Sequence, residues 1–148
     1  MSEEIYSLND SIGYNVRNFN RALKVQIVNN FRESKLDVKI EEWITLAYLN
    51  EHSDKNQIQL GDLLMQDKTA VTRLLDVLEE KKQIKRIIDK RDKRNRIVKI
   101  TPDGKKAYLK ILPVVERTIA QAKAGVSDKD YKTAIASLQK MTANLLAL

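Results

Sequence analysis

The chain has 148 residues, of which 43% are hydrophobic and 32% are charged, and its formal net charge is +7. This length suits one domain, or one domain with an appended assembly region. The sequence contains no cysteine, which excludes disulfides, thiol redox chemistry and thiolate metal sites.

The sequence also argues against a membrane protein. No apolar run approaches the about 18 residues that a membrane-spanning helix requires. Residues 1–10 lack the basic and apolar regions of a signal peptide. We therefore expect a cytoplasmic protein with no membrane partner. Its positive charge favours a polyanionic partner such as nucleic acid.

The first half of the chain is predicted to be helical. In residues 5–31 the apolar side chains recur at helical spacing, which predicts one long amphipathic helix. Residues 34–39 interrupt the pattern, and a second helix is expected over about residues 40–49. The polar residues 50–57 (NEHSDKNQ) predict a loop.

Two further helices follow the loop. Residues 58–66 (IQLGDLLMQ) predict a short helix, and residues 67–82 (DKTAVTRLLDVLEEKK) predict a clearer one. Asp67 suits the N-cap position, because its carboxylate can accept the free amide hydrogens of the first turn. The apolar residues of the second segment fall on one buried stripe. They are Val71, Leu74, Leu75 and Leu78.

A charged β-hairpin is predicted next. Residues 83–89 (QIKRIID) and 96–101 (RIVKIT) are rich in isoleucine and enclose the polar tip. Residues 89–96 (DKRDKRNR) hold five basic and two acidic side chains. Over residues 66–99 there are twelve basic and six acidic residues, a net charge of +6. Nearly all of the excess positive charge of the chain therefore lies around this hairpin.

The chain ends in two predicted helices. Thr101 suits an N-cap and Pro102 the first helical position, so one helix starts there and runs to about Lys123. Ser127, with Asp130 three residues later, predicts the start of the last helix. The expected fold is mainly α with a small β-hairpin.

This order of elements is the plan of a winged helix-turn-helix, in which the capped helix enters the DNA major groove and the hairpin forms the wing. The N-terminal half of the capped helix presents small, polar or basic side chains suited to base edges. These are Lys68, Thr69, Ala70, Thr72 and Arg73. The wing can place an arginine in the minor groove. The candidate wing residues are Arg91, Asp92, Lys93, Arg94 and Arg96. We expect Asp92 to hold the guanidinium of Arg94 by a bidentate contact.

These residues resemble the MarR family of bacterial transcription regulators. The most specific parts are VTRLLDVLE, residues 71–79, and the wing with Asp92 and Arg94 leading into ITPDGK, residues 100–105. IGYNVRNFNRAL, residues 12–23, and KLDVKIEEWITLAYL, residues 35–49, are similar to the family's first two helices. The resemblance covers nearly the whole chain.

The resemblance implies one domain over residues 1–148, with a DNA-binding core over 36–101. Residues 5–32 and 102–148 would form the helical dimerisation region. It implies a homodimeric repressor on a pseudo-palindromic promoter site, released by a small, aromatic effector. The residues that would bind such an effector are unknown. The long apolar stripes of the terminal helices favour a dimer independently.

Some residues depart from the family pattern or leave other functions open. Gln83 stands where members commonly have glycine, and a left-handed residue there would cost about 1 kcal/mol. Met65 stands where many have a small residue. Trp43 is expected in the core, and His52 in solvent.

We expect no catalytic residues, metal site or cofactor, since neither a phosphate-binding glycine loop nor a nucleophile elbow is present. An RNA- or protein-binding winged helix is the alternative function.

Overall fold

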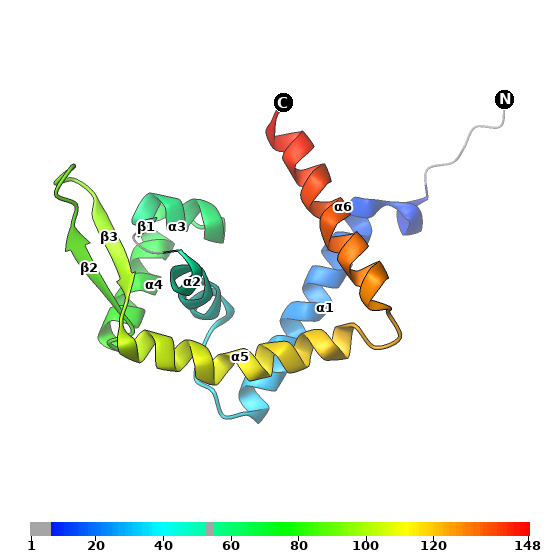
Figure 1. Cartoon of the computed structure of the whole chain (residues 1–148), viewed down its shortest axis with the longest axis horizontal. Coiled ribbons are helices and arrows are strands. Elements are labelled where there is room, and N and C mark those ends of the chain that lie inside the picture. The colour runs from blue at the N-terminus through cyan, green and yellow to red at the C-terminus, as the bar shows by residue number, and fades with distance from the viewer. Residues whose placement is uncertain (1–6, 53–54) are drawn as a thin grey trace.

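The computed structural model describes residues 7–52 and 55–148. After a short 3₁₀ turn, Leu8–Asp10, the helices are α1 (Ile12–Glu33), α2 (Ile40–Glu51), α3 (Gln57–Leu64), α4 (Lys68–Glu80), α5 (Pro102–Ala122) and α6 (Asp128–Leu146). The strands are β1 (Lys55–Asn56), β2 (Ile84–Ile88) and β3 (Arg96–Ile100). The mainly α fold with a β-hairpin wing is confirmed. In Figure 1 the winged region, which comprises α2, α3, α4 and the three strands, lies at one end of the molecule. The helical region of α1 and α6 lies at the other end, and α5 reaches from one to the other.

The first long helix starts later than its apolar spacing predicts. Helix α1 begins at Ile12, because Ser11 adopts an extended backbone and its hydroxyl accepts a hydrogen bond from the backbone N–H of Tyr14. A capping residue of this kind has a non-helical backbone, so the helix cannot extend further toward the N-terminus. Residues 5 and 6, which were also predicted to be helical, lie outside the described residues.

The predicted loop at residues 50–57 is wrong in part. Asn50 and Glu51 extend α2, and Lys55–Asn56 forms a short strand that pairs antiparallel with β3, giving a sheet in the order β1-β3-β2. Asn56 also caps α3, accepting a hydrogen bond from the backbone N–H of Gln59 over 2.8 Å. Ser53 and Asp54 lie outside the described residues. Such a short polar strand has no periodicity of its own, so β3 has to supply its pairing.

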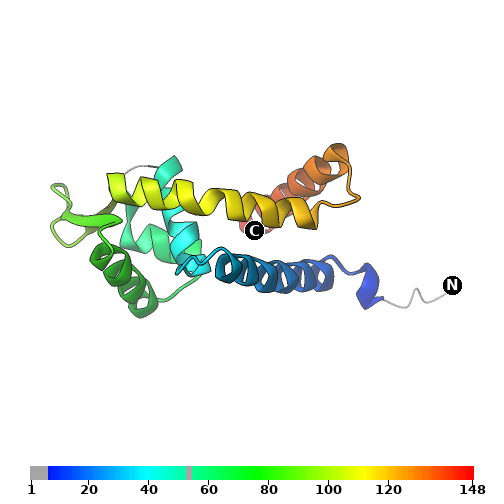
Figure 2. The ribbon, with the colours of Figure 1, turned by 90° about the horizontal axis from the view of Figure 1, so that it is seen from below.

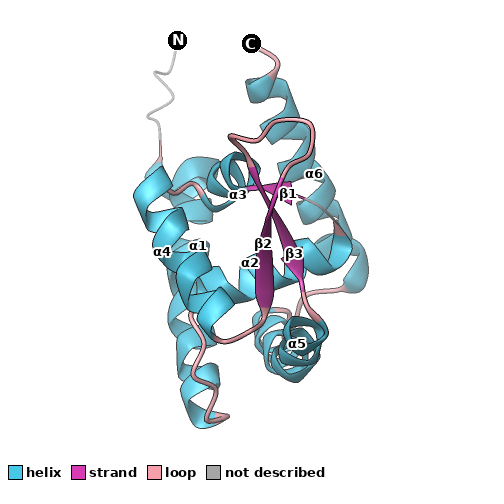
Figure 3. Cartoon of the chain, turned by 90° about the vertical axis from the view of Figure 1, so that its left-hand side faces the viewer, coloured by secondary structure: helices cyan, strands magenta, loops and turns pink. Residues whose placement is uncertain are grey.

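The core of the winged region forms where the predicted stripe of α4 meets the sheet. Val71, Leu75 and Leu78 are buried, and Leu74 packs against them while partly exposed. Ile84 from β2 completes this contact with an exposed fraction of 2%. Burial of these side chains fixes α4 against β2, and so orients the face of α4 that remains in solvent. Figure 3 views this region from the wing side, with α5 seen end-on.

Helix α5 joins the winged region to the helical region. Trp43 of α2 is half-buried and stacks on Tyr108 of α5, with ring centroids 5.3 Å apart. Further along, the buried Asn30 of α1 donates hydrogen bonds of 2.8 Å to Thr118 and Gln121 of α5. These contacts align α1 with α5, and Figure 2 shows the two helices running side by side.

Three of the helices end on left-handed residues that are not glycine. Lys35, Met65 and Lys82 have φ values of 55°, 52° and 60°. The strain considered for Gln83 does not fall on that residue. Lys82 is the left-handed residue, and Gln83 follows it to donate its backbone N–H to the carbonyl of Leu78 over 2.9 Å. This is the Schellman pattern, which satisfies carbonyls at a helix end.

Apolar side chains remain uncovered on the helical region. Helix α6 turns back from the end of α5 (Figure 1), and none of its residues is buried. Large apolar residues on α1 are also in solvent: Ile12, Tyr14, Val16, Phe19, Val25 and Val28. Those on α6 are Ile135, Met141, Leu145 and Leu146. Within the described parts of the chain, no helix combines the length and apolar character needed to cross a membrane.

Candidate nucleic-acid interface

The first candidate surface is the N-terminal half of α4. The carboxylate of Asp67 accepts a hydrogen bond of 2.8 Å from the backbone N–H of Ala70, which confirms the predicted N-cap. Lys68, Thr69 and Arg73 are exposed, whereas Ala70 and Thr72 are half-buried. The Thr72 hydroxyl donates to the Lys68 carbonyl over 2.8 Å, so it is engaged within the helix. This end of α4 therefore offers two cations and a threonine hydroxyl to solvent.

The second candidate surface is the wing tip, where the acidic residues shape the backbone. The carboxylate of Asp92 accepts from the backbone N–H of Arg94 over 3.0 Å, and the Asp89 carboxylate accepts from the backbone N–H of Arg91 over 2.8 Å. The expected contact between Asp92 and the Arg94 guanidinium is wrong. An aspartate can close an Asx turn two residues ahead, so this carboxylate oxygen is engaged locally by the amide.

The basic side chains of the tip are consequently left in solvent. Arg91, Lys93, Arg94 and Arg96 are exposed, as is Asp92. The Arg96 guanidinium donates to the backbone carbonyl of Lys93 over 3.3 Å, which directs it along the tip. With Lys90, which is also exposed, five cations thus project from a turn whose backbone is fixed by its own aspartates.

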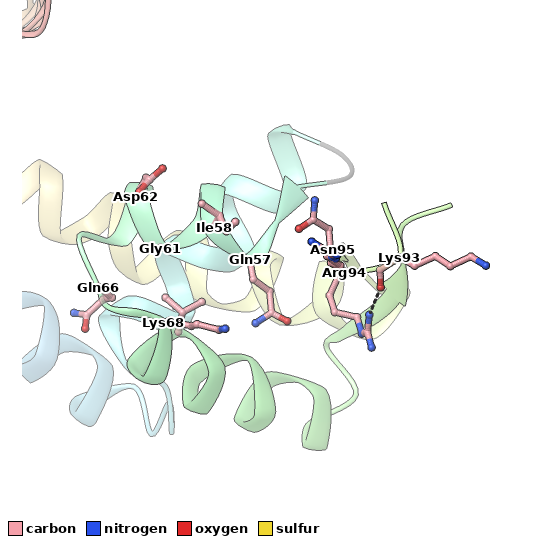
Figure 4. A pocket seen from close by; sticks show the side chains of 11 residues that line it. Gln57, Ile58, Gly61, Asp62, Gln66, Lys68, Lys93, Arg94 and Asn95 are labelled. Atoms are coloured by element: carbon pink, nitrogen blue, oxygen red, sulfur yellow. Dashed lines mark hydrogen bonds between the residues drawn. The ribbon is translucent and has the colours of Figure 1, made fainter. Parts of the chain in front are cut away.

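A cavity of about 590 Å³ lies between these two surfaces. In Figure 4 the start of α3, the start of α4 and the wing tip enclose it. Four of the predicted site residues line it: Lys68, Lys93, Arg94 and Arg96. Asp62 is the acidic residue of its lining. A concave surface with this charge is suited to a phosphate backbone.

Sequence reasoning missed part of this lining. Gln57 opens α3, Gln66 lies in the turn before α4, and Asn95 belongs to the wing tip, yet all three reach the cavity. No spacing in the sequence links them, because three separate elements bring them together. Thr69 and Arg73 lie outside the cavity lining, on the exposed face of α4, and Arg91 and Asp92 lie at the tip.

An ion-pair cluster at the base of the wing was also missed. Arg86 of β2 donates from Nε to Glu79 over 2.5 Å and from Nη2 to Asp76 over 2.6 Å, both on α4. Partial burial alone would lower the pKa of Arg86, but its hydrogen bonds to the two carboxylates and their charges outweigh burial and raise the pKa. Arg86 therefore stays charged, and it joins the wing to α4.

The remaining polar side chains provide little sign of a metal site. His52 lies against the ring of Tyr48, with centroids 4.6 Å apart, and is otherwise exposed. Across residues 7–52 and 55–148, no three acidic or histidine side chains gather closely enough to hold a metal ion.

Comparison with known proteins identifies the winged region. The sequence profile of the MarR family matches residues 36–95, from the segment before α2 to the wing tip. This segment is therefore similar to the winged region of the MarR family. The match includes α4, β2 and most of the cavity lining, so the candidate surfaces belong to the part of the chain that carries the family pattern.

Solved structures extend the likeness to the whole fold. A MarR-family transcriptional regulator from Rhodococcus sp. RHA1 superposes with a TM-score of 0.83 at 18% identity, covering 93% of this chain and 96% of that one. S. aureus MepR, in its complex with DNA, gives 0.74 at 24% identity, with coverages of 90% and 98%. Bordetella bronchiseptica BpsR, whose DNA binding is regulated by 6-hydroxynicotinic acid, gives 0.80 at 17% identity, with coverages of 93% and 97%. The chain therefore shares the MarR fold, including the helices outside the winged region.

Proposed function

We propose that this protein is a transcription regulator that binds double-stranded DNA in a sequence-specific manner and represses the promoter it occupies. The observation that carries the proposal is the cationic cavity between α4 and the wing, flanked by exposed basic side chains. The similar fold of MepR, which was solved as a DNA complex, supports a duplex as the ligand. The protein would act in the cytoplasm, by binding and not by catalysis.

Each surface has a role in this proposal. The N-terminal half of α4 enters the major groove, where Arg73 reads a base edge and Lys68, Thr69, Ala70 and Thr72 line the contact. The strand of phosphates between the two grooves crosses the cavity and is neutralised by its cations. The wing reaches the adjacent minor groove with Arg94, while Arg91, Lys93 and Arg96 contact the backbone and Asp92 shapes the turn.

The regulator would act as a homodimer. Helix α6 buries none of its residues in the single chain, and the apolar face of α1 is similarly uncovered. Apolar surface of this extent favours association with a second copy. Two winged regions related by twofold symmetry would then match the two halves of a pseudo-palindromic site, about one helical turn apart. Sedimentation of the full chain as a monomer at micromolar concentration would contradict this assembly.

A small aromatic effector would release the DNA. Support comes from BpsR, a protein of similar fold whose DNA binding is regulated by 6-hydroxynicotinic acid. Such an effector acts only if it binds the DNA-free conformation more tightly than the DNA-bound one. Titrating the protein–duplex complex with a panel of hydroxylated aromatic acids tests this step, and unchanged affinity across the panel would remove support for it.

The central experiment compares nucleic acids. Duplexes selected by the full-length protein from a random library should share a palindromic motif, and the selected duplex should bind far more tightly than a hairpin RNA of equal length at the same salt concentration. A winged helix that serves RNA would show the reverse preference. Equal binding to every duplex would leave only sequence-independent attraction to phosphate.

A further inference from the structure

Arg86 occupies a particular place in the wing. It is the middle residue of β2 and pairs with Val98 of β3, which is fully buried. Alternate residues of a strand share one face, so Arg86 lies on the same side as Ile84 and Ile88. Ile84 is 2% exposed and Ile88 is 55% exposed. Beyond Arg86, therefore, β2 leaves the body of the protein.

The two carboxylates that hold Arg86 come from the C-terminal half of α4. Asp76 and Glu79 are three positions apart, so their side chains are neighbours on one helix face. The Arg86 side chain is 21% exposed, while those of Asp76 and Glu79 are 57% and 41% exposed. A guanidinium offers its donors in a rigid fork. Because separate nitrogens bond to the two acids, the direction of Arg86 is fixed as well as its position.

We propose that Arg86 is a positioning residue that sets the angle between the wing and α4, and through it the spacing between the minor-groove and major-groove contacts. This inference rests on the DNA-binding function proposed above. Arg86 itself would not contact the bases. It would act through the placement of the tip, whose cations lie several residues further along the hairpin.

Geometry shows why an anchor at this point matters. From Arg86 to the tip the hairpin continues for about four to five residues, or about 15 Å at the usual rise of a strand. A rotation of about 10° at the anchor would therefore move the tip by about 2.5 Å, which exceeds the tolerance of a well-positioned contact. On the opposite edge of the sheet, the described residues of β1 pair with β3 at Val98 and Ile97. Past these points, the backbone hydrogen bonds from Asp89 to Asn95 and from Asn95 to Asp92 both lie within the tip itself.

The same arrangement explains two acidic residues on a helix that is proposed to face DNA. Unpaired, Asp76 and Glu79 would repel phosphate and weaken binding. Paired with Arg86, one of their two negative charges is offset, and both carboxylates are held toward the wing base. The alternative is that the cluster only contributes the small stability of exposed ion pairs. The two explanations differ in whether sequence preference at the wing changes.

The test uses the full-length protein and the duplex that it selects from a random library. Affinity is measured at one salt concentration for that duplex with A·T pairs, and then with G·C pairs, at the positions flanking each half-site, where the wing would enter the minor groove. The ratio of the two affinities is the readout. In Arg86→Gln we expect this ratio to fall by about threefold or more, because a displaced tip loses part of its minor-groove contact. Arg86→Lys keeps the charge and one bond, and should lie between.

Charge is separated from positioning by two controls. Lys85→Gln removes the same charge from an exposed neighbour on the same strand. It should lower the affinity for both duplexes equally, so that the ratio of affinities is unchanged. The double variant Asp76→Asn, Glu79→Gln removes two negative charges. Electrostatics alone would therefore tighten binding to both duplexes and leave the ratio of affinities unchanged. Positioning instead predicts a lower ratio in this double variant also.

The outcomes are distinct. A melting temperature for each variant checks folding, and if Arg86→Gln does not fold, the double variant at two exposed acids decides by itself. An unchanged ratio in Arg86→Gln, or in the double variant, would overturn the positioning role while leaving the DNA-binding function intact. A wild-type chain that selects no duplex would overturn the proposed function and this inference with it.

Discussion

Replacing Gly104 by alanine should destabilise the whole winged region. Gly104 is the third residue of α5 and is buried beneath the turn that follows α4. An added Cβ would overlap the carbonyl oxygen of Gln83, and would lie 2.7 Å from Cγ1 of Ile100. The first neighbour is backbone and cannot rotate away. Either α5 or the turn must move.

The magnitude follows from what such a movement breaks. Thr101 donates its backbone N–H to the Gln83 carbonyl over 3.0 Å and its hydroxyl to the Lys82 carbonyl over 2.6 Å, and it caps Gly104 over 3.0 Å. Overpacking costs about 1–3 kcal/mol, loss of the cap about 1 kcal/mol, and loss of another hydrogen bond about 1 kcal/mol. The better helix propensity of alanine returns up to about 1 kcal/mol. The net expectation is a loss of about 2–4 kcal/mol in the free energy of unfolding.

Urea denaturation followed by circular dichroism measures this loss, at one protein concentration because the proposed dimerisation would shift apparent stability. Gly13→Ala is the matched control. Gly13 is the second residue of α1, and an added Cβ would meet only the Ser11 hydroxyl, at 3.9 Å. This variant should gain up to about 1 kcal/mol. If Gly104→Ala unfolds within about 0.5 kcal/mol of wild type, about the scale of an ordinary surface substitution, the close-approach argument is wrong.

Four further variants test other parts of the molecule. Arg73→Ala should lose about 1–3 kcal/mol on the selected duplex and much less on random DNA, and equal losses in a fluorescence titration would mean that Arg73 contacts only phosphate. Arg94→Ala should reduce the preference for A·T-rich flanks, whereas Lys93→Ala should lower the salt slope by about one unit with the preference retained. Lys82→Gly relieves a left-handed φ of 60°. It should raise the free energy of unfolding by about 0.5–1 kcal/mol, seen as a higher urea midpoint. A lower midpoint would show that this turn is unstrained.

The features that the sequence predicted are those encoded locally. Asp67, Thr101 and Ser127 each accept a hydrogen bond from a backbone N–H three residues later, as their positions before an apolar run indicated. The buried stripe of α4 was predictable because apolar residues at helical spacing form one face of the helix, and that face packs against the core. These signals need no knowledge of the remainder of the chain, and they placed both candidate DNA-binding elements.

The features that were missed depend on distant partners. Lys55 and Asn56 become a strand only because β3 offers its free edge more than forty positions later. Gln57 and Gln66 reach the cavity because α3 and α4 fold against the wing. Arg86 had no evident role in an alternating strand, since its two acids lie on another element. Tertiary placement, and not propensity, determines each of these.

Asp92 offers the sharpest test of how the wing tip works. Its carboxylate accepts a 3.0 Å hydrogen bond from the backbone N–H of Arg94, so it shapes the turn by which Arg94 is presented. Asp92→Asn keeps an oxygen acceptor for this bond, whereas Asp92→Ala removes it, and both variants add the same net positive charge. If the turn matters, Asp92→Asn should bind the selected duplex more tightly than wild type, because the charge alone has changed. Asp92→Ala should bind more weakly and lose preference for A·T-rich flanks, despite the added charge. Affinities at several salt concentrations separate the contributions, since the charge effect fades with salt and the turn effect persists. Equal, tighter binding by both variants would show that the hairpin is a cationic arm whose shape does not matter.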